Sequence, residues 1–422
     1  HHFESAFAAL GVTAATLTGE TAQDDRKKIF RSLAEGSVDV ILTTPEFLFF
    51  HGAEFAESKR VGFVVIDEAH HVGQAAAEGR HAYAKMPLIL QQLEHPQVLA
   101  LTATAKSDTA KTICHLCAIS ENYVIKDATV RDNLRLRDAR EIQDREAALT
   151  CIVASGEKCV AYVNSREQAQ SICRMLRHAI PDMGHEIAFY HAGLSRQTRA
   201  VERAFRKGEV TCVVATSAFG EGINVADIRH VVLYHLPFGR VAYNQQSGRA
   251  GRDGQPAHIH LFFGAHDMRI NERILSSSAP DRAALIPVYR ALMTLFRRAQ
   301  KTSSTLQASD EEIASCACEI EPRCKADANS VACALDIFCE LGFLTLQGFD
   351  AKRNISMNPV AAPMDLYAST RYAEGLKTRE SFEAFAQWAL SASPDELLGA
   401  VNKPIVPDFG EEVDGGEDVS HG

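Results

Sequence analysis

The sequence predicts an α/β protein with parallel sheets, followed by a helical region that ends in a small hairpin. In the first two-thirds of the chain, short β-branched or aromatic runs alternate with amphipathic helical stretches, which is the pattern of parallel strands joined by crossover helices. After Gly264 this alternation gives way to helices. The 422 residues provide enough chain for two or three domains of about 150 residues each.

Eight runs in the first part have the length and composition of buried strands. They cover residues 38–43, 61–66, 98–102, 159–163, 186–190, 212–216, 231–235 and 258–263. The segment 127–144 is polar, rich in Arg and Asp, and lacks strong periodicity, so we interpret it as a linker between two α/β domains. We place the first domain over 1–126 and the second over 127–264.

A helical connector is predicted over 265–305. Apolar residues at helical spacing indicate one buried face: Leu285, Val288, Tyr289, Leu292 and Phe296. At the other end of the chain, residues 401–422 are acidic and rich in Gly, and we expect a disordered tail there.

A winged-helix-like domain is predicted over 306–400. Ser309 and Glu312 have the spacing of a capping box, and a further helix ends at Gly342. Two short strands follow, over 343–346 and 354–357. Helices that end in such a hairpin are typical of a winged helix.

The composition narrows the function classes. The formal net charge of −10 argues against binding polyanions through overall charge, so any nucleic-acid site must be a local basic patch. No apolar stretch approaches the roughly 18 residues of a membrane span, and no secretory signal is present, so we expect a cytoplasmic protein. The eleven cysteines are scattered, which favours reduced core thiols. Those between 316 and 339 lack paired C-x-x-C spacing, so zinc is not expected.

The sharpest local feature is the apolar run 63–66, which is followed by Asp67, Glu68 and His70. A buried parallel strand delivers its last residues to the ligand crevice. There, one carboxylate can hold Mg²⁺ and the next can orient a water for attack on phosphate. Taken alone, the four letters D-E-A-H fit equally well a strand followed by a capping acid.

Two further segments favour phosphate chemistry. Leu101-Thr102-Ala103-Thr104-Ala105 ends the next strand, and Gly248-Arg249-Ala250-Gly251-Arg252 lies far downstream. Glycine admits a close approach of the ligand, and Arg neutralises charge that develops on a transferred phosphoryl group.

Seven short motifs follow one another along the chain, over 43–46, 67–70, 101–105, 164–166, 190–194, 215–224 and 248–254. In this set and order, the first 270 residues resemble the superfamily 2 helicases and, within them, the RecQ family. The resemblance implies two RecA-like domains, the first of them incomplete, with ATP between them and single-stranded DNA across their upper faces.

The resemblance also implies roles for individual residues. Asp67 would hold Mg²⁺ through water, and Glu68 would be the catalytic base. Arg252 would be the arginine finger, with Arg249 supporting it. The residues that couple the nucleotide state to DNA would be His70, Thr102 and Thr104. Nucleotide contacts are implied for Gly220, Gly222, Asn224 and Gln246, and backbone-phosphate contacts for Thr44, Asn164, Ser165 and Arg166.

Between residues 269 and 301, Arg and Lys outnumber Asp and Glu. In an acidic protein this local excess is a candidate phosphate-contacting face, in which we include Arg297 and Arg298. The alternative is an ordinary solvated helix surface.

The sequence departs from the family in two places. It contains no G-x-x-x-x-G-K-[ST], the loop that cradles the β- and γ-phosphates, so we expect a truncated chain that lacks ATPase activity by itself. The loop over 71–80 matches the aromatic-rich loop of RecQ proteins only at Gln74 and Arg80. The coupling of DNA to ATP that this loop performs in the family is therefore in question.

Our first hypothesis is an ATP-dependent DNA helicase of RecQ type that unwinds duplex DNA in recombination and repair, with 3′ to 5′ polarity implied by the resemblance. The alternative is a DNA-binding or regulatory module without its own ATPase. The segment 372–398 weakly resembles the C-terminal region of RecJ-type exonucleases, which suggests an exonuclease domain upstream in a fused protein.

Overall fold

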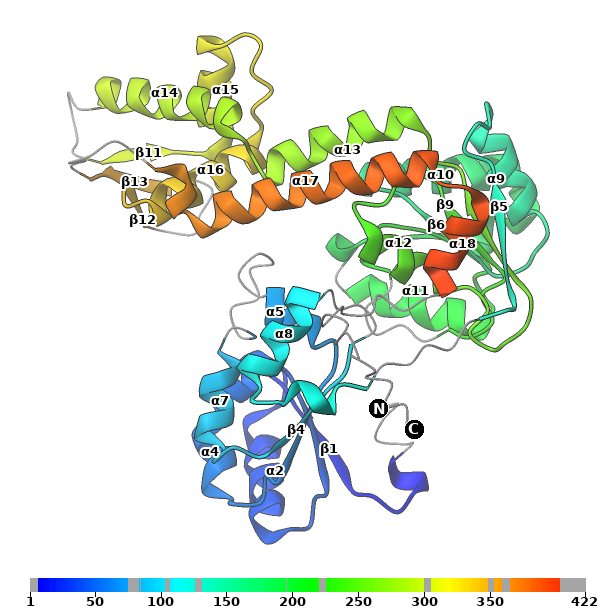
Figure 1. Cartoon of the computed structure of the whole chain (residues 1–422), viewed down its shortest axis with the longest axis vertical. Coiled ribbons are helices and arrows are strands. Elements are labelled where there is room, and N and C mark those ends of the chain that lie inside the picture. The colour runs from blue at the N-terminus through cyan, green and yellow to red at the C-terminus, as the bar shows by residue number, and fades with distance from the viewer. Residues whose placement is uncertain are drawn as a thin grey trace, which may run out of the picture. The chain divides into compact units, whose positions relative to one another are not determined.

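The computed structural model describes residues 7–74, 83, 85–102, 107–125, 131–194, 196–219, 225–299, 305–347, 353–358 and 365–402. The described residues form two compact units, one before and one after residue 128 (Figure 1). Within the described part of the chain, every helix is too short or too polar to span a bilayer.

The first unit contains two pairs of parallel strands and the helices that pack on them. The strands are β1 (Ala14–Leu17) with β2 (Val40–Thr43), and β3 (Phe63–Ile66) with β4 (Gln97–Ala100). The helices are α2 (Gln23–Glu35), α3 (Pro45–Phe50), α4 (Gly52–Glu57), α5 (His70–Gln74), α7 (Met86–Gln92) and α8 (Ser107–Leu116). They share one core with the inner faces of the strands, around Leu17, Phe47, Ile66 and Ile89.

One face of the β3–β4 pair is not covered by the described residues. Side chains alternate along a strand, and Val64 and Ile66 face the core. Phe63 and Val65 point the other way and are 52% and 53% exposed, and Leu99 on β4 is 42% exposed. Parallel sheets are normally covered on both faces, whereas the described residues of this unit cover the β3–β4 pair on one face only.

The second unit is built on a six-stranded parallel sheet in the order β5-β10-β9-β6-β8-β7. Its strands are β5 (Leu134–Asp138), β6 (Cys159–Tyr162), β7 (Ile187–Tyr190), β8 (Cys212–Ala215), β9 (His230–Leu233) and β10 (Ala257–Leu261). Helices α9 (Arg145–Val153) and α10 (Arg166–Ala179) cover one face. Helices α11 (Arg196–Lys207) and α12 (Arg240–Ser247) contribute to the core on the other. The predicted α/β class is confirmed.

The interpretation of 127–144 as a linker is wrong for residues 134–138, which form β5. This strand pairs with β10 alone, at the edge of the sheet. Its Leu134 and Leu136 face a core, whereas Arg135 and Arg137 are exposed. An edge strand with one solvated face carries no continuous apolar run, so the sequence pattern did not predict β5.

The residues after 264 form long helices and a small three-stranded antiparallel sheet in the order β11-β13-β12. The elements are α13 (Ala265–Ser278), α14 (Arg282–Ala299), β11 (Leu306–Ala308), α15 (Asp310–Ile320), α16 (Ala328–Glu340), β12 (Leu344–Gln347) and β13 (Arg353–Met357). The predicted capping box at Ser309 and Glu312 begins α15. Cys316 and Cys333 lie in the core of this module, as expected for core thiols.

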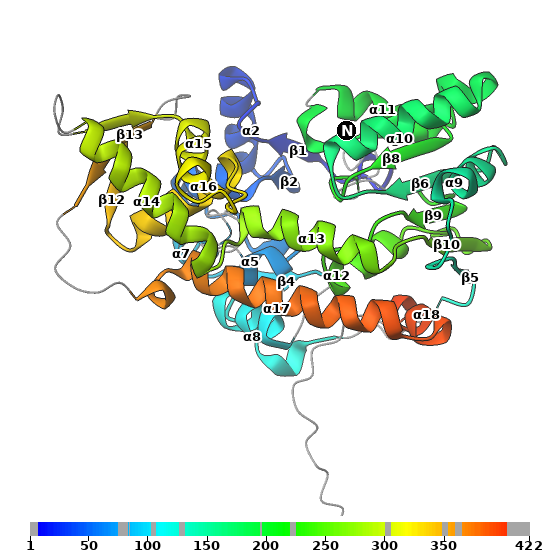
Figure 2. The same ribbon diagram turned by 90° about the horizontal axis from the view of Figure 1, so that it is seen from above.

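Two C-terminal helices return to the large sheet. They are α17 (Thr370–Ser391) and α18 (Pro394–Asn402), and α17 runs beside α13 (Figures 1 and 2). Tyr372 belongs to the core of the helical module, but Phe382, Phe385 and Leu397 belong to the core of the large sheet. The region predicted as one winged-helix-like domain over 306–400 is thus divided between two cores. The acidic tail predicted over 401–422 lies outside the described residues from 403 on.

The α17–α18 segment is bound to α12 by polar contacts as well as packing. Tyr243 donates a hydrogen bond from its hydroxyl to the Leu397 carbonyl at 3.0 Å, and Asn244 donates to the Ala400 carbonyl at 2.8 Å. The Arg240 guanidinium lies 4.0 Å from the centre of the Trp388 ring. This cation–π contact and the two hydrogen bonds fix α12 against the end of the chain.

Three histidines lie together on the sheet of the second unit. His230 on β9 and His258 on β10 are register partners with stacked rings, and His230 Nδ1 lies 3.1 Å from His260 Nε2. Arg135 and Arg137 on β5 are the neighbours in register of His258 and His260, and Glu157 Oε2 lies 2.9 Å from His230 Nε2. Burial and then the neighbouring positive groups lower the pKa of His258 and bring the pKa of His260 to about 3.

We predict that the first unit unfolds before the second. Phe63, Val65 and Leu99 on its exposed sheet face are only about half-buried. Each of them therefore contributes on the order of 1 kcal/mol less to stability than a fully buried side chain would. Hydrogen exchange of residues 61–66 should therefore lose protection at a lower urea concentration than that of residues 212–216. Loss of protection in both segments at one midpoint would contradict this.

We also predict that the second unit is acid-labile through His260. In the unfolded chain a His pKa is about 6.5, so the unfolded state binds the proton first and stability falls as the pH drops below that value. Between pH 6.5 and 5 this histidine alone should cost roughly 2 kcal/mol of unfolding free energy. Urea unfolding of H260Q should show a shallower pH dependence than the wild type. The control is H185Q, because the His185 side chain is 75% exposed; equal slopes in wild type and H260Q would refute the prediction.

Candidate nucleotide and nucleic-acid site

The two carboxylates of the D-E-A-H segment lie at the carboxyl end of β3. The strand ladder continues past β3, because Leu101 N–H donates to the Ile66 carbonyl and Ala69 N–H to the Leu101 carbonyl, both at 2.8 Å. Glu68 has a φ of 49°, in the left-handed region that side chains other than Gly rarely adopt. Backbone strain of this kind concentrates at functional sites, so the geometry favours a role for this turn.

His70 connects the ends of β3 and β4. It is 6% exposed, and its Nδ1 lies 3.2 Å from Thr102 Oγ1 and 3.3 Å from Glu68 Oε2. The His71 ring packs on the His70 ring at 4.1 Å, and the Tyr83 ring lies 5.4 Å from that of His71. The structure therefore brings together three residues named from the sequence. The fourth, Thr104, lies outside the described residues.

Asp67 has the chemistry of a Mg²⁺ ligand. Its carboxylate is exposed at the end of the strand, and one oxygen accepts a hydrogen bond from Glu68 N–H at 2.9 Å. Mg²⁺ prefers oxygen ligands and usually keeps several of its waters, so one or two protein carboxylates suffice. The two acids at the end of β3 fit such an ion.

In the second unit, the loop that carries Arg249 and Arg252 is held by side chains from the start of the unit. Arg131 donates hydrogen bonds to the carbonyls of Gly248, Ala250 and Gly251. Asn133 donates to the Gly251 carbonyl at 2.8 Å and to that of Gln255 at 2.7 Å. A single guanidinium thus binds three carbonyls of one loop, and the loop has a defined shape.

Gly251 fits between the Asn133 side chain and the Gln255 carbonyl because it lacks a side chain. Its φ is +53°, and a Cβ atom there would come within 2.7 Å of Asn133 Nδ2 and of the Gln255 carbonyl. Any other residue would be strained and would displace the Asn133 contact.

Arg249 and Arg252 lie near the end of β6. Burial raises the pKa of Tyr162 to about 12, and the positive charges of these two arginines act against that rise. The Tyr162 hydroxyl donates to the Phe219 carbonyl at 2.8 Å, directly before the segment 220–224. Gln246 is buried on α12. The other expected nucleotide contacts, Gly220, Gly222 and Asn224, lie outside the described residues.

Three of the expected phosphate contacts have structural roles that the sequence analysis did not foresee. Thr44 caps α3 by accepting a hydrogen bond from Phe47 N–H at 3.3 Å, and Ser165 caps α10 by accepting from Gln168 N–H at 3.1 Å. Asn164 donates to the Leu236 carbonyl at 2.8 Å and to the side chain of Asn271 on α13. Asn164 and Ser165 follow β6 at the carboxyl end of the large sheet, which is called the upper edge of the second unit below.

Arg166, His191 and Gly193 form a small cradle at that edge. Arg166 is exposed and makes no hydrogen bond or ion pair within the described residues. A Cβ at Gly193 would lie 3.2 Å from His191 Nδ1 and 3.3 Å from Arg166 Nη1, so the three converge. His191 is 6% exposed, and its buried Nδ1 has no partner among the described residues.

The electrostatics of the cradle favour an anion. His191 Nε2 lies 3.2 Å from the Gln170 side-chain nitrogen, which can only donate, so the ring proton belongs on Nδ1. Burial and then the charge of Arg166 lower the pKa of His191, which keeps the ring neutral. The exposed Arg166 guanidinium, with no side chain at Gly193 beside it, suits a phosphate oxygen, and the His191 N–H lies buried behind it. The sequence named this histidine only as part of a motif.

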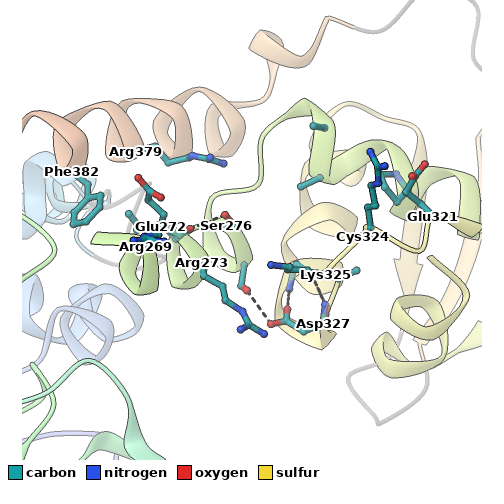
Figure 3. Close-up of a pocket in the computed structure, with 18 of the residues that line it drawn as sticks. Arg269, Glu272, Arg273, Ser276, Glu321, Cys324, Lys325, Asp327, Arg379 and Phe382 are labelled. Atoms are coloured by element: carbon teal, nitrogen blue, oxygen red, sulfur yellow. Dashed lines mark hydrogen bonds between the residues drawn. The ribbon is translucent and has the colours of Figure 1, made fainter. Parts of the chain in front are cut away.

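The basic segment 269–301 is divided in the structure. Arg269 and Arg273 line an open groove of about 860 Å³ in the second unit (Figure 3). Arg297 and Arg298 are exposed in the last turn of α14, about 15 Å along the helix from Pro287, which also lines the groove. Arg297 and Arg298 do not line this groove.

Comparison with known proteins matches both units to helicase families. The DEAD/DEAH box helicase model matches residues 1–113, and the model of the helicase conserved C-terminal domain matches residues 144–254. Among solved structures, the DUF1998 helicase MrfA bound to DNA and AMPPNP aligns with a TM-score of 0.50 at 15% identity, covering 87% of this chain and 52% of that one. At that identity, the likeness concerns the fold alone.

Curated relatives are RecQ-type helicases. The chain is 32% identical over 271 residues to the ATP-dependent DNA helicase RecQ of Pasteurella multocida (strain Pm70), covering 63% of this chain and 42% of the relative. It is 33% identical over 293 residues to the ATP-dependent DNA helicase Q4 of Homo sapiens, covering 64% and 24%. The chain therefore spans less than half the length of these relatives. With the two domain matches, these identities show that the chain belongs to the superfamily 2 helicases and, within them, to the RecQ family.

Proposed function

We propose that this chain is the larger part of the motor of an ATP-dependent DNA helicase that uses ATP and Mg²⁺. The observation that carries the proposal is the position of His70, in contact with both Glu68 and Thr102. Glu68 follows β3 and Thr102 follows β4, and His70 contacts both. A side chain in this position can transmit the state of the nucleotide to bound DNA. The names of the relatives, both ATP-dependent DNA helicases, support the proposal.

The residues at the end of β3 would act on the nucleotide. ATP supplies the phosphoryl group, and Mg²⁺ neutralises part of its charge. Asp67 would hold the ion, and Glu68 would orient the attacking water and accept its proton. Arg252, supported by Arg249, would neutralise charge on the transferred group. The frame made by Arg131 and Asn133 keeps their loop in one shape.

Nucleic acid would lie on the upper edge of the second unit, where Arg166 presents donors to a phosphate. Contacts of this kind position a strand without reading its sequence. Translocation from 3′ to 5′, action on duplex DNA in recombination and repair, a cytoplasmic location and a fused exonuclease are further parts of the proposal. The polarity and the role in recombination and repair rest on the family resemblance. The location rests on the composition, and the fused exonuclease rests on the weak resemblance of 372–398 to RecJ-type exonucleases.

A second candidate function for the chain as printed is nucleic-acid binding without ATP hydrolysis. The sequence contains no G-x-x-x-x-G-K-[ST], and without that loop no backbone cradle and no Lys hold the β- and γ-phosphates. The chain would then bind DNA through the second unit, while hydrolysis would need a phosphate-binding loop that this sequence does not supply.

We predict that the chain hydrolyses ATP at the background rate, because only the Mg²⁺ and arginine sides of the site are present. Phosphate release should be the same for the wild type and for E68Q, with or without single-stranded DNA. DNA-stimulated turnover in the wild type well above that of E68Q would contradict this.

We predict that R166A weakens binding of single-stranded DNA by the whole chain. Each phosphate contact that is lost should lower the slope of log affinity against log salt by roughly 0.7. Titration of a labelled oligothymidylate at several salt concentrations measures both quantities. The matched control is R174A, which removes an exposed arginine from the same helix. If R166A binds like R174A, the cradle does not contact the strand.

A further inference from the structure

The cations that line the groove of the second unit come from three separate elements. Helix α13 contributes Arg269 and Arg273, the connection between α15 and α16 contributes Arg323 and Lys325, and α17 contributes Arg379 (Figure 3). Its walls therefore come from the helix that leaves the large sheet and from the winged-helix-like module. A ligand in the groove would contact both.

Four of these cations are available to a ligand. Arg269, Arg273, Arg323 and Lys325 form no ion pair or hydrogen bond with any described residue. Arg379 is engaged, because it pairs with Asp281 at 3.3 Å and donates to the Ala279 carbonyl at 3.4 Å.

Two of the four acids in the lining are engaged as well. Glu321 pairs with Arg290 at 3.8 Å, and Asp327 caps α16 and accepts a hydrogen bond from Ser277 at 3.0 Å. Glu272 and Glu383 are the remaining carboxylates of the lining. The hydrogen bonds of Asp327 do not cancel its charge, so four unpaired cations face three carboxylates that have no ion-pair partner. This leaves one net positive charge in the groove of a chain whose net charge is −10.

Helix α16 does not offer an alternative nucleic-acid surface. It follows α15 in the position of the second helix of a helix-turn-helix, which reads the major groove in many DNA-binding proteins. Here its side chains face the core, among them Val331, Leu335 and Phe338, and only Asn329 and Glu340 are exposed. A helix buried on nearly all sides cannot enter a DNA groove.

The groove is suited to a backbone and not to bases. Its one aromatic residue, Phe382, is 2% exposed and cannot stack on a base. Arginine and lysine side chains, in contrast, bind phosphate oxygens without regard to sequence.

We propose that this groove binds the phosphodiester backbone of nucleic acid, as a second contact separate from the Arg166 cradle. The proposal rests on the proposed function only in taking nucleic acid as the ligand. The same chemistry serves a single strand or the outer backbone of a duplex, so the test uses both.

The test compares the wild-type chain with a double variant that combines R273A and R323A. This variant removes one cation from each wall of the groove. Binding of a labelled oligothymidylate and of a blunt duplex is measured over a range of salt concentrations. Loss of two contacts should lower the log–log slope by roughly 1.4 on the single strand or roughly 1.8 on the duplex, at about 0.7 and about 0.9 per contact. The probe whose slope falls by its own expected amount identifies the form that the groove holds.

Two controls separate the groove from general charge and from folding. The pair R174A with R203A removes the same charge from exposed positions on α10 and α11 and should leave the slope unchanged. The pair R273K with R323K keeps the charges and should bind like the wild type. An alanine pair that binds both probes like the wild type, or a slope loss equal to that of the R174A and R203A pair, would overturn the proposal. The proposal would also be overturned if the alanine pair lost binding of a polyglutamate peptide while its binding of both oligonucleotides stayed unchanged.

The outcomes also separate this proposal from the proposed function. A slope loss in R166A but not in the groove pair removes the groove and keeps the cradle. The reverse result keeps the groove and removes the cradle. If neither variant changes the slope, nucleic acid binds at neither place and both proposals are wrong.

Discussion

Burial of the six-stranded parallel sheet on both faces is the constraint on which the second unit depends. Strands packed between two helical layers are almost wholly apolar, and the polar exceptions in the central strands are His230, His258 and His260 on β9 and β10. Polar groups therefore gather where the strands end, at Asn164 after β6, at His191 after β7 and at Thr216 after β8. Since parallel strands end at one edge, motifs that are far apart in the sequence become neighbours there.

The shape of the arginine loop depends on groups from distant parts of the chain. Arg131 and Asn133 bind its carbonyls from the start of the unit, and Arg229 pairs with Asp253 at 2.6 Å just beyond it. Burial lowers the pKa of Arg131, so its charge is partly desolvated, and three carbonyl acceptors compensate for that cost. The helix before the loop is fixed by α18 at the other end of the chain. The loop is therefore preformed.

The sequence predicts those parts of the fold in which both sides of an element are apolar. All eight strands expected from continuous apolar runs are present within a few residues, because such runs are typical of strands whose two faces are both apolar. Strand β5 has one solvated face, and α17 changes cores between Tyr372 and Phe382, so neither has a simple pattern. At the site, residue types could be predicted but not the side-chain contacts. The binding of Asn164 to Asn271 depends on a helix more than 100 residues away.

That contact makes α13 the connection between the two candidate nucleic-acid surfaces. Asn271 is fully buried and joins α13 to Asn164, beside the Arg166 cradle, and also donates to the Leu236 carbonyl at 2.6 Å. At its far end the same helix meets α16, where the Ser278 carbonyl accepts from the Cys333 thiol. A helix of 14 residues is about 21 Å long and resists bending. With α17 packed along it, any displacement of the sheet edge must carry the groove with it. Nucleic acid held at both places would therefore be moved as one body with the second unit.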